Sequence, residues 1–178
     1  FILSYATFYY FFRLTIRTGL FRLYYGRNFK RTSFIYSFLE FKPKLKILSF
    51  DLETNRQASI VYSISMICDD FRKVLIVSDK QLENAISFKT EKEMLEFFKK
   101  KVLELDPDIL ISHNVIGFDL KVLRDRFDAN RISFSLGRLP DRVQLKIETN
   151  YGRTSSADVK GRNVFDTFLL FKDQFKIK

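Results

Sequence analysis

The chain has 178 residues, of which 46% are hydrophobic and 29% are charged, so it can form a domain with a sizeable core and is not compositionally disordered. A single cysteine, Cys68, and a single histidine, His113, exclude a disulfide framework, a Cys-rich zinc module and a His-rich metal site. Any metal chemistry must therefore rest on carboxylates. The net charge of +10 suits a polyanionic partner. Because the chain starts at Phe1, we expect a processed or partial chain.

Basic and aromatic residues are concentrated in the first 42 residues. This region holds seven Lys and Arg residues against one acid, Glu40, and it holds 15 of the 29 Phe and Tyr residues. The following Lys42-Pro43-Lys44 is typical of a linker. We therefore predict an aromatic, basic, β-rich N-terminal region over 1–42 and a second domain over 43–178.

The aromatic region allows more than one interpretation. Its aromatic residues form the core of a small β-rich subdomain, or they stack bases while the arginines neutralise phosphates. An organelle transit peptide fits less well, because such peptides are rarely this aromatic. No run of about 20 residues avoids charge, so no membrane span is expected.

Three strands are predicted at the start of the second domain. Residues 46–54, 59–68 and 73–77 are rich in β-prone residues and are joined by short connections, which favours an antiparallel meander. In the first of these runs apolar and polar side chains alternate, which puts the acids Asp51 and Glu53 together on the polar face.

Helices and a buried strand are predicted next. Residues 90–93 (TEKE) match a capping box at the start of an amphipathic helix over 91–105. Residues 109–111 are wholly apolar, as expected of a buried strand beside a parallel neighbour, and a second helix is expected over 120–127. This order predicts an α/β fold with a mixed sheet and flanking helices.

Two polar clusters carry the candidate chemistry. Asp51 and Glu53 project from the same side of an apolar strand, and burying both is costly unless a cation or protons offset their charges. Asn114 follows the buried strand and Asp119 begins the next helix, where α/β sheets present ligands. Hard divalent cations bind such carboxylate oxygens. The alternatives are two exposed acids on a wet sheet face and, for Asp119, a plain helix cap. We assign His113 no catalytic role.

Phe50-Asp-Leu-Glu-Thr54 and Asn114-x-x-x-Phe118-Asp119 resemble the first two exonuclease motifs of family B DNA polymerases. The elements between them match that family's order, and Leu136-Gly137-Arg138 and Lys160-Gly161-Arg162 resemble its downstream elements. The resemblance covers about 44–178 and is greatest to the bacterial DNA polymerase II branch, with the archaeal enzymes next. It implies an RNase H-like 3′→5′ proofreading exonuclease that uses two divalent metal ions, Mg²⁺ or Mn²⁺.

The resemblance also implies roles for single residues. Asp51 would bridge both metal ions, Glu53 would hold the ion beside the attacking water, and Asp119 would hold the other. Asn114 and Phe118 would position the 3′-terminal nucleotide. The implied partners are DNA, as a single-stranded 3′ end or a primer–template, and a sliding clamp, with no membrane and a cytoplasmic, nucleoid-associated location.

The family's third exonuclease motif, a Tyr followed four residues later by an Asp, does not occur before the chain ends. We therefore expect a domain truncated before this motif, with weak metal binding and little activity by itself. Tyr151 is no substitute because Ser155 occupies the needed place. Asp166, on a strand-like run over 163–168, is a further candidate for direct involvement. A stand-alone RNase H-like nuclease of another family and a non-catalytic module that binds single-stranded nucleic acid remain alternatives.

Overall fold

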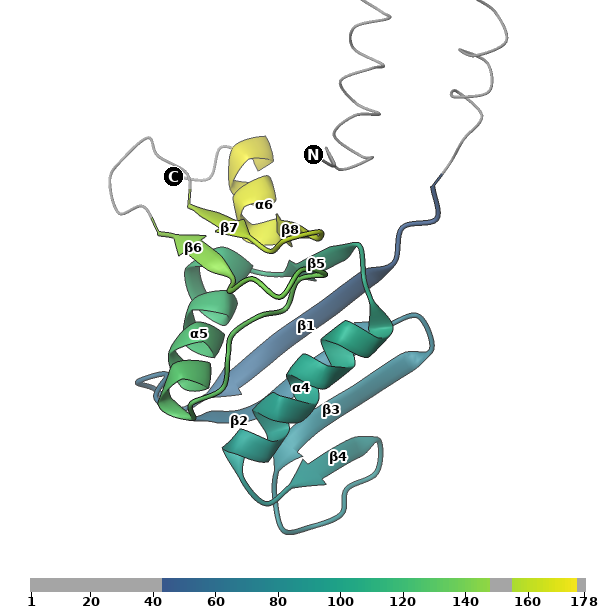
Figure 1. Ribbon diagram of the computed structural model, residues 1–178, viewed down its shortest axis with the longest axis vertical. Coiled ribbons are helices and arrows are strands. Elements are labelled where there is room, and N and C mark those ends of the chain that lie inside the picture. Colours follow the sequence, from purple (N-terminus) through teal and green to yellow (C-terminus); the bar gives the residue numbers. More distant parts are fainter. Residues whose placement is uncertain (1–42, 148–154, 176–178) are drawn as a thin grey trace, which may run out of the picture. The chain divides into compact units, whose positions relative to one another are not determined.

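The computed structural model describes residues 43–147 and 155–175, so the aromatic region predicted over 1–42 lies outside the described residues. The chain divides into two units, 1–44 and 45–178, and the second contains the α/β domain (Figure 1). The domain boundary after residue 42 stays a prediction. None of the helices in the described part is long and apolar enough to cross a membrane.

A six-stranded mixed sheet with the strand order β4-β3-β2-β1-β5-β8 forms the centre of this domain. Its first three strands form the predicted antiparallel meander, whereas β4 pairs parallel to β3, and β5 pairs parallel to both β1 and β8. The strands are Ile47–Thr54 (β1), Val61–Cys68 (β2), Phe71–Val77 (β3), Ala85–Phe88 (β4), Ile109–Ser112 (β5) and Asn163–Asp166 (β8). The predicted mixed α/β architecture is confirmed.

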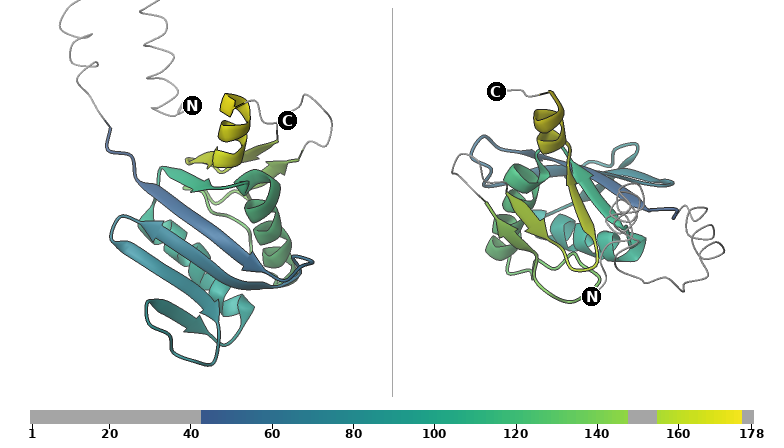
Figure 2. Two further views of the ribbon diagram at one scale, coloured as in Figure 1. Left: turned by 180° about the vertical axis from the view of Figure 1, so that it is seen from behind. Right: turned by 90° about the horizontal axis from the view of Figure 1, so that it is seen from above.

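Two helices, α4 (Glu91–Leu105) and α5 (Leu120–Ala129), lie on one face of the sheet (Figure 1). Seen from behind, strands β1 to β3 are not covered by any helix of the described residues (Figure 2). The helix α6 (Thr167–Phe175) follows β8 directly, and a small antiparallel sheet pairs β6 (Gln144–Lys146) with β7 (Ser156–Asp158). The two faces of the main sheet therefore differ in their environment.

Local signals set the ends of α4 where the sequence predicts them. The Thr90 hydroxyl accepts the Glu93 N–H at 3.2 Å, and the Glu93 carboxylate accepts the Thr90 N–H at 3.3 Å, which completes the capping box. The helix ends at Asp106, which adopts a left-handed conformation with φ 45°. The prediction of a helix over 91–105 is confirmed.

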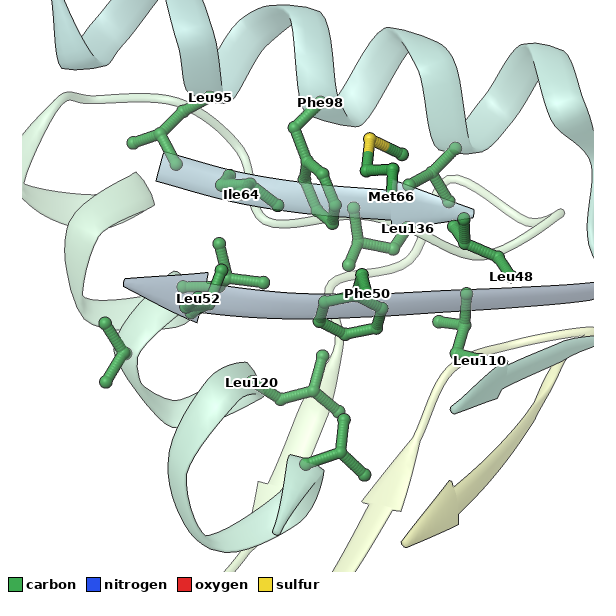
Figure 3. Close-up of a cluster of buried hydrophobic side chains, with 14 of the residues drawn as sticks. Leu48, Phe50, Leu52, Ile64, Met66, Leu95, Phe98, Leu110, Leu120 and Leu136 are labelled. Carbon is green, nitrogen blue, oxygen red and sulfur yellow. The ribbon is translucent and has the colours of Figure 1, made fainter. Parts of the chain in front are cut away.

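The hydrophobic core lies between the sheet and the helices α4 and α5 (Figure 3). On β1, Leu48, Phe50 and Leu52 are at most 5% exposed, and the ring of Phe50 packs 5.7 Å from that of Phe98 on α4. Each fully buried side chain of this size contributes about 1.5–3 kcal/mol. Because these apolar side chains face the helices, the alternate residues of β1 project from the uncovered face.

Two arginines fasten the segments downstream of α5 to the end of α4. The buried Arg162 guanidinium donates to the carbonyl of Leu136 at 2.8 Å and to the carboxylate of Asp106 at 2.7 Å. Arg138 donates to Asp106 at 2.8 Å and to Asp108 at 2.9 Å. Hydrogen bonds from Arg138 and then Arg162 hold the pKa of Asp106 below its usual value. These contacts fix the approach to β8, and thereby place its carboxyl end beside that of β5.

Candidate active site

The acidic pair on β1 lies on the uncovered face of the sheet. Asp51 and Glu53 are both exposed, and their partners in the β1–β2 register are the small residues Ser65 and Ser63. Of the two interpretations of this pair, the structure shows the exposed one, since no described helix packs on this face and the neighbouring serines are too short to cover the carboxylates. Both carboxylates are open to solvent and to any ligand that approaches this side.

The second polar cluster lies in a tight turn between β5 and α5. Five residues, Val115–Asp119, form a single π-helical turn (η1), a geometry that occurs frequently at functional sites. Asn114, which precedes it, has a left-handed backbone with φ 65°, and its carbonyl accepts the Phe118 N–H at 2.8 Å. Phe118 is exposed and Asn114 is half-buried. The two residues predicted to contact nucleic acid are thus accessible and belong to one turn.

Asp119, at the end of this turn, is the most unusual carboxylate of the described domain. It is 1% exposed, and its side chain makes no helix-capping hydrogen bond, so the interpretation as a plain cap is wrong. The Ser112 hydroxyl donates to Oδ2 at 3.2 Å, whereas Oδ1 has no hydrogen-bond partner. Burial, as the largest cause, and the negative charge of Asp51 raise the pKa of Asp119 to about 6, against the Ser112 hydrogen bond and the smaller lowering effects of the Asp119 and Leu52 backbone N–H groups.

An unpaired, buried carboxylate oxygen fits a role as a ligand for a hard cation. Leaving such an atom without a partner is costly, and Mg²⁺ prefers carboxylate oxygens. The structure places Asp119 close enough to Asp51 for their charges to interact. Within the described residues, however, no three His, Cys, Asp or Glu side chains gather closely enough to hold a metal ion, so Glu53 does not complete a three-carboxylate group with this pair.

Two further residues lie next to this turn. His113 is exposed, and its Nδ1 lies 3.1 Å from the hydroxyl of Thr167. Asp166 is 7% exposed and accepts backbone N–H groups from Asn114 at 3.0 Å and from Ile116 at 3.1 Å. Only its position on a strand-like run singled out Asp166 in the sequence, and nothing in that run indicated contact with the turn.

Known proteins show the same domain. The model of "DNA polymerase family B, exonuclease domain" matches residues 24–178. The DNA polymerase of Desulfurococcus sp. (strain Tok) is 32% identical over 136 residues, which are 73% of this chain and 17% of that protein. The DNA polymerase delta catalytic subunit of Plasmodium falciparum is 27% identical over 166 residues, with 76% of this chain and 15% of that protein covered.

A solved structure shares the fold. The family B DNA polymerase from the archaeon Pyrobaculum calidifontis superposes with a TM-score of 0.54 and 24% identity, over 72% of this chain and 16% of that one. This structure supports the mixed sheet with flanking helices that the sequence predicts.

The fold is an α/β domain with a mixed sheet, and its candidate carboxylates come from β1 and from the turn after β5. The chain belongs to the exonuclease domain family of the family B DNA polymerases. It spans less than a fifth of the length of the relatives named above. Because these relatives are archaeal and eukaryotic, the closer resemblance to the bacterial DNA polymerase II branch is not confirmed and stays a prediction.

Proposed function

We propose that the chain is the 3′→5′ proofreading exonuclease part of a DNA polymerase and hydrolyses the 3′-terminal phosphodiester of DNA. The observation that supports this most directly is the buried, unpaired Oδ1 of Asp119 near Asp51, in a chain of this family. Asp51, Glu53 and Asp119 would hold two divalent ions, Mg²⁺ or Mn²⁺, between them, with neither ion held by all three carboxylates, since no three such side chains gather in the described residues. When bound, such ions lower the pKa of a water molecule and stabilise the attacking and leaving oxygens.

The residues of the chain itself bind and orient the substrate. The exposed ring of Phe118 offers a stacking surface for a base, which tolerates any sequence because every base has a π-face. The Asn114 amide, in the same turn, can donate to and accept from the terminal nucleotide. Neither stacking on Phe118 nor hydrogen bonding by Asn114 needs a histidine or a protein nucleophile. This agrees with the side chain of His113, which is bonded to Thr167.

The partners and the location belong to the same proposal. The substrates are single-stranded 3′ ends and primer–template DNA, and the net charge of +10 favours this polyanion. The polymerase that contains this domain would also bind a sliding clamp, and it would act in the cytoplasm in association with the nucleoid.

Mismatched 3′ ends are expected to be degraded about tenfold faster than matched ends, because the terminal nucleotide must leave the stack and unpairing costs least at a mismatch. Primers labelled at the 5′ end, annealed with and without a terminal mismatch, measure both rates at fixed salt. A preference for 5′ ends or for the RNA strand of a hybrid would favour a nuclease of another family. Binding of single strands without degradation would favour a non-catalytic module.

Gly117→Ala is expected to raise the KM for single-stranded DNA about tenfold, because an added Cβ would lie 2.4 Å from Oδ1 of Asn114 and displace its amide. The free energy of unfolding should change by less than about 1 kcal/mol, since alanine favours a helical turn. Gly137→Ala is the matched control, because its Cβ would lie 2.5 Å from the backbone oxygen of Lys160.

The Gly137→Ala control is expected to lower stability by about 1–3 kcal/mol without changing KM. Steady-state kinetics and urea unfolding separate the two effects. An unchanged KM in folded Gly117→Ala protein would remove Asn114 from nucleotide binding.

A further inference from the structure

The carboxylate of Asp166 joins two elements at the carboxyl end of β8. Its Oδ1 accepts the N–H groups of Asn114 at 3.0 Å and of Phe168 at 3.0 Å. The Leu169 N–H lies 3.4 Å from the same oxygen. Its Oδ2 accepts the N–H of Ile116 at 3.1 Å. One buried carboxylate therefore holds both the start of η1 and the start of α6.

The part of the chain held in this way is irregular and carries the candidate site. The first N–H groups of a helix have no intrahelical acceptor, so those of Asn114 and Ile116 depend on a partner from elsewhere. Asn114 has a left-handed backbone, and the π-helical turn that follows ends at Asp119 only three residues after Ile116. The Ile116 bond to Asp166 therefore holds the same turn that carries Asp119.

A second connection reaches the Asp119 side chain through β5. The β5–β8 register pairs Asp166 with Ser112, whose hydroxyl donates to Asp119 Oδ2 at 3.2 Å. The Thr167 hydroxyl, next to Asp166, donates to the Ser112 carbonyl at 3.2 Å. The turn that carries Asp119 and the serine that binds its side chain are thus both connected to the end of β8.

We propose that Asp166 is a positioning residue, which holds η1 so that Asp119 and Asn114 take their places in the site. The proposal rests on the function proposed above. It favours positioning over the other candidate role of Asp166, direct involvement, because both of its oxygens are engaged by backbone N–H groups. Charged acceptors make the stronger hydrogen bonds to backbone N–H groups, which suits a carboxylate to this task.

The test compares Asp166→Asn with Asp108→Asn in the full-length protein. Asparagine keeps the shape but offers one acceptor oxygen in place of two. Asp108 is the matched control, because its carboxylate also accepts a backbone N–H, that of Lys46 at 2.9 Å, and it precedes the opposite end of β5.

For Asp166→Asn we expect kcat to fall about 10–100-fold with KM within about twofold, and Mn²⁺ affinity measured by calorimetry to fall by a similar factor. Asp108→Asn should lower the melting temperature while keeping kcat and Mn²⁺ affinity within about threefold. In addition, Asp119→Asn combined with Asp166→Asn should be no less active than Asp119→Asn alone, since residues that act as a unit are not additive.

Equal kcat and Mn²⁺ affinity in folded Asp166→Asn and unsubstituted protein would overturn the proposal, as would additive losses in the double variant. If the full-length protein with no substitution binds Mn²⁺ but degrades no DNA, the proposed function fails, and the Mn²⁺ comparison still tests Asp166.

If Asp166→Asn does not fold, amide hydrogen exchange in the unsubstituted protein tests the proposal instead. Mg²⁺ should slow exchange at Asn114 and Ile116, because a ligand on Asp119 stabilises the turn that Asp166 holds. The Lys46 amide, bonded to Asp108, should be unaffected. Equal effects of Mg²⁺ on Ile116 and Lys46 would reduce Asp166 to a structural residue and overturn the proposal.

Discussion

In the full-length protein, alanine at Asp51 or at Glu53 is expected to slow degradation of 3′ ends by about 10³-fold or more while DNA binding stays within about twofold. The reason is that removing either carboxylate removes a ligand for the ion that activates the attacking water. Affinity for DNA, in contrast, comes mainly from Lys and Arg contacts with phosphates. Both carboxylates are exposed on β1, so their removal should leave the core intact.

Trimming of a labelled single strand and its binding are measured side by side at one salt concentration. Asp70→Ala is the control, because Asp70 is an exposed acid in the turn between β2 and β3, and it should trim at the normal rate. Near-normal trimming by Asp51→Ala or Glu53→Ala would contradict their assignment as metal ligands. A loss of binding equal to the loss of trimming would assign them to substrate binding instead.

Elements with local signals could be predicted closely from the sequence. The helix α4 begins at the capping box that the sequence predicts. It ends before Asp106, which the structure shows in a left-handed conformation. The alternation along β1 correctly separated Leu48, Phe50 and Leu52 from the acidic face. In these elements each residue type and its neighbours along the chain carry the information, so no tertiary contact had to be known.

Features that depend on tertiary packing could not be predicted. Alternation along β1 left open whether Asp51 and Glu53 are buried or exposed, and they are exposed because no described helix covers their face of the sheet. The strand β4 has only four half-buried residues and no alternation. The unpaired oxygen of Asp119 depends on residues that are distant in sequence but adjacent in the sheet.

Asp119→Asn is expected to raise the free energy of unfolding by about 2–3 kcal/mol at pH 7.5 in EDTA, although it removes activity. Burial and the charge of Asp51 raise the pKa of Asp119 from 3.8 to about 6 in the folded state. The folded state therefore holds this proton more tightly than the unfolded state does. The stability that the protonated group provides is complete below about pH 4, and it is lost as the pH rises through 6.

Urea unfolding between pH 4 and pH 7.5 measures this loss of stability in the unsubstituted protein and in Asp119→Asn. The difference between their free energies of unfolding should grow with pH, because asparagine has no proton to lose. Ser112→Ala should instead lower the free energy of unfolding at pH 7.5. The Ser112 hydroxyl donates to Oδ2 and lowers the pKa of Asp119, so its loss makes the ionised carboxylate more costly to bury. Mg²⁺ should stabilise only the protein with Asp119, because a cation offsets the buried charge. A less stable Asp119→Asn at pH 7.5 in EDTA would show that the ionised carboxylate is already satisfied by the protein. Its unpaired oxygen would then no longer support a metal ligand at this position.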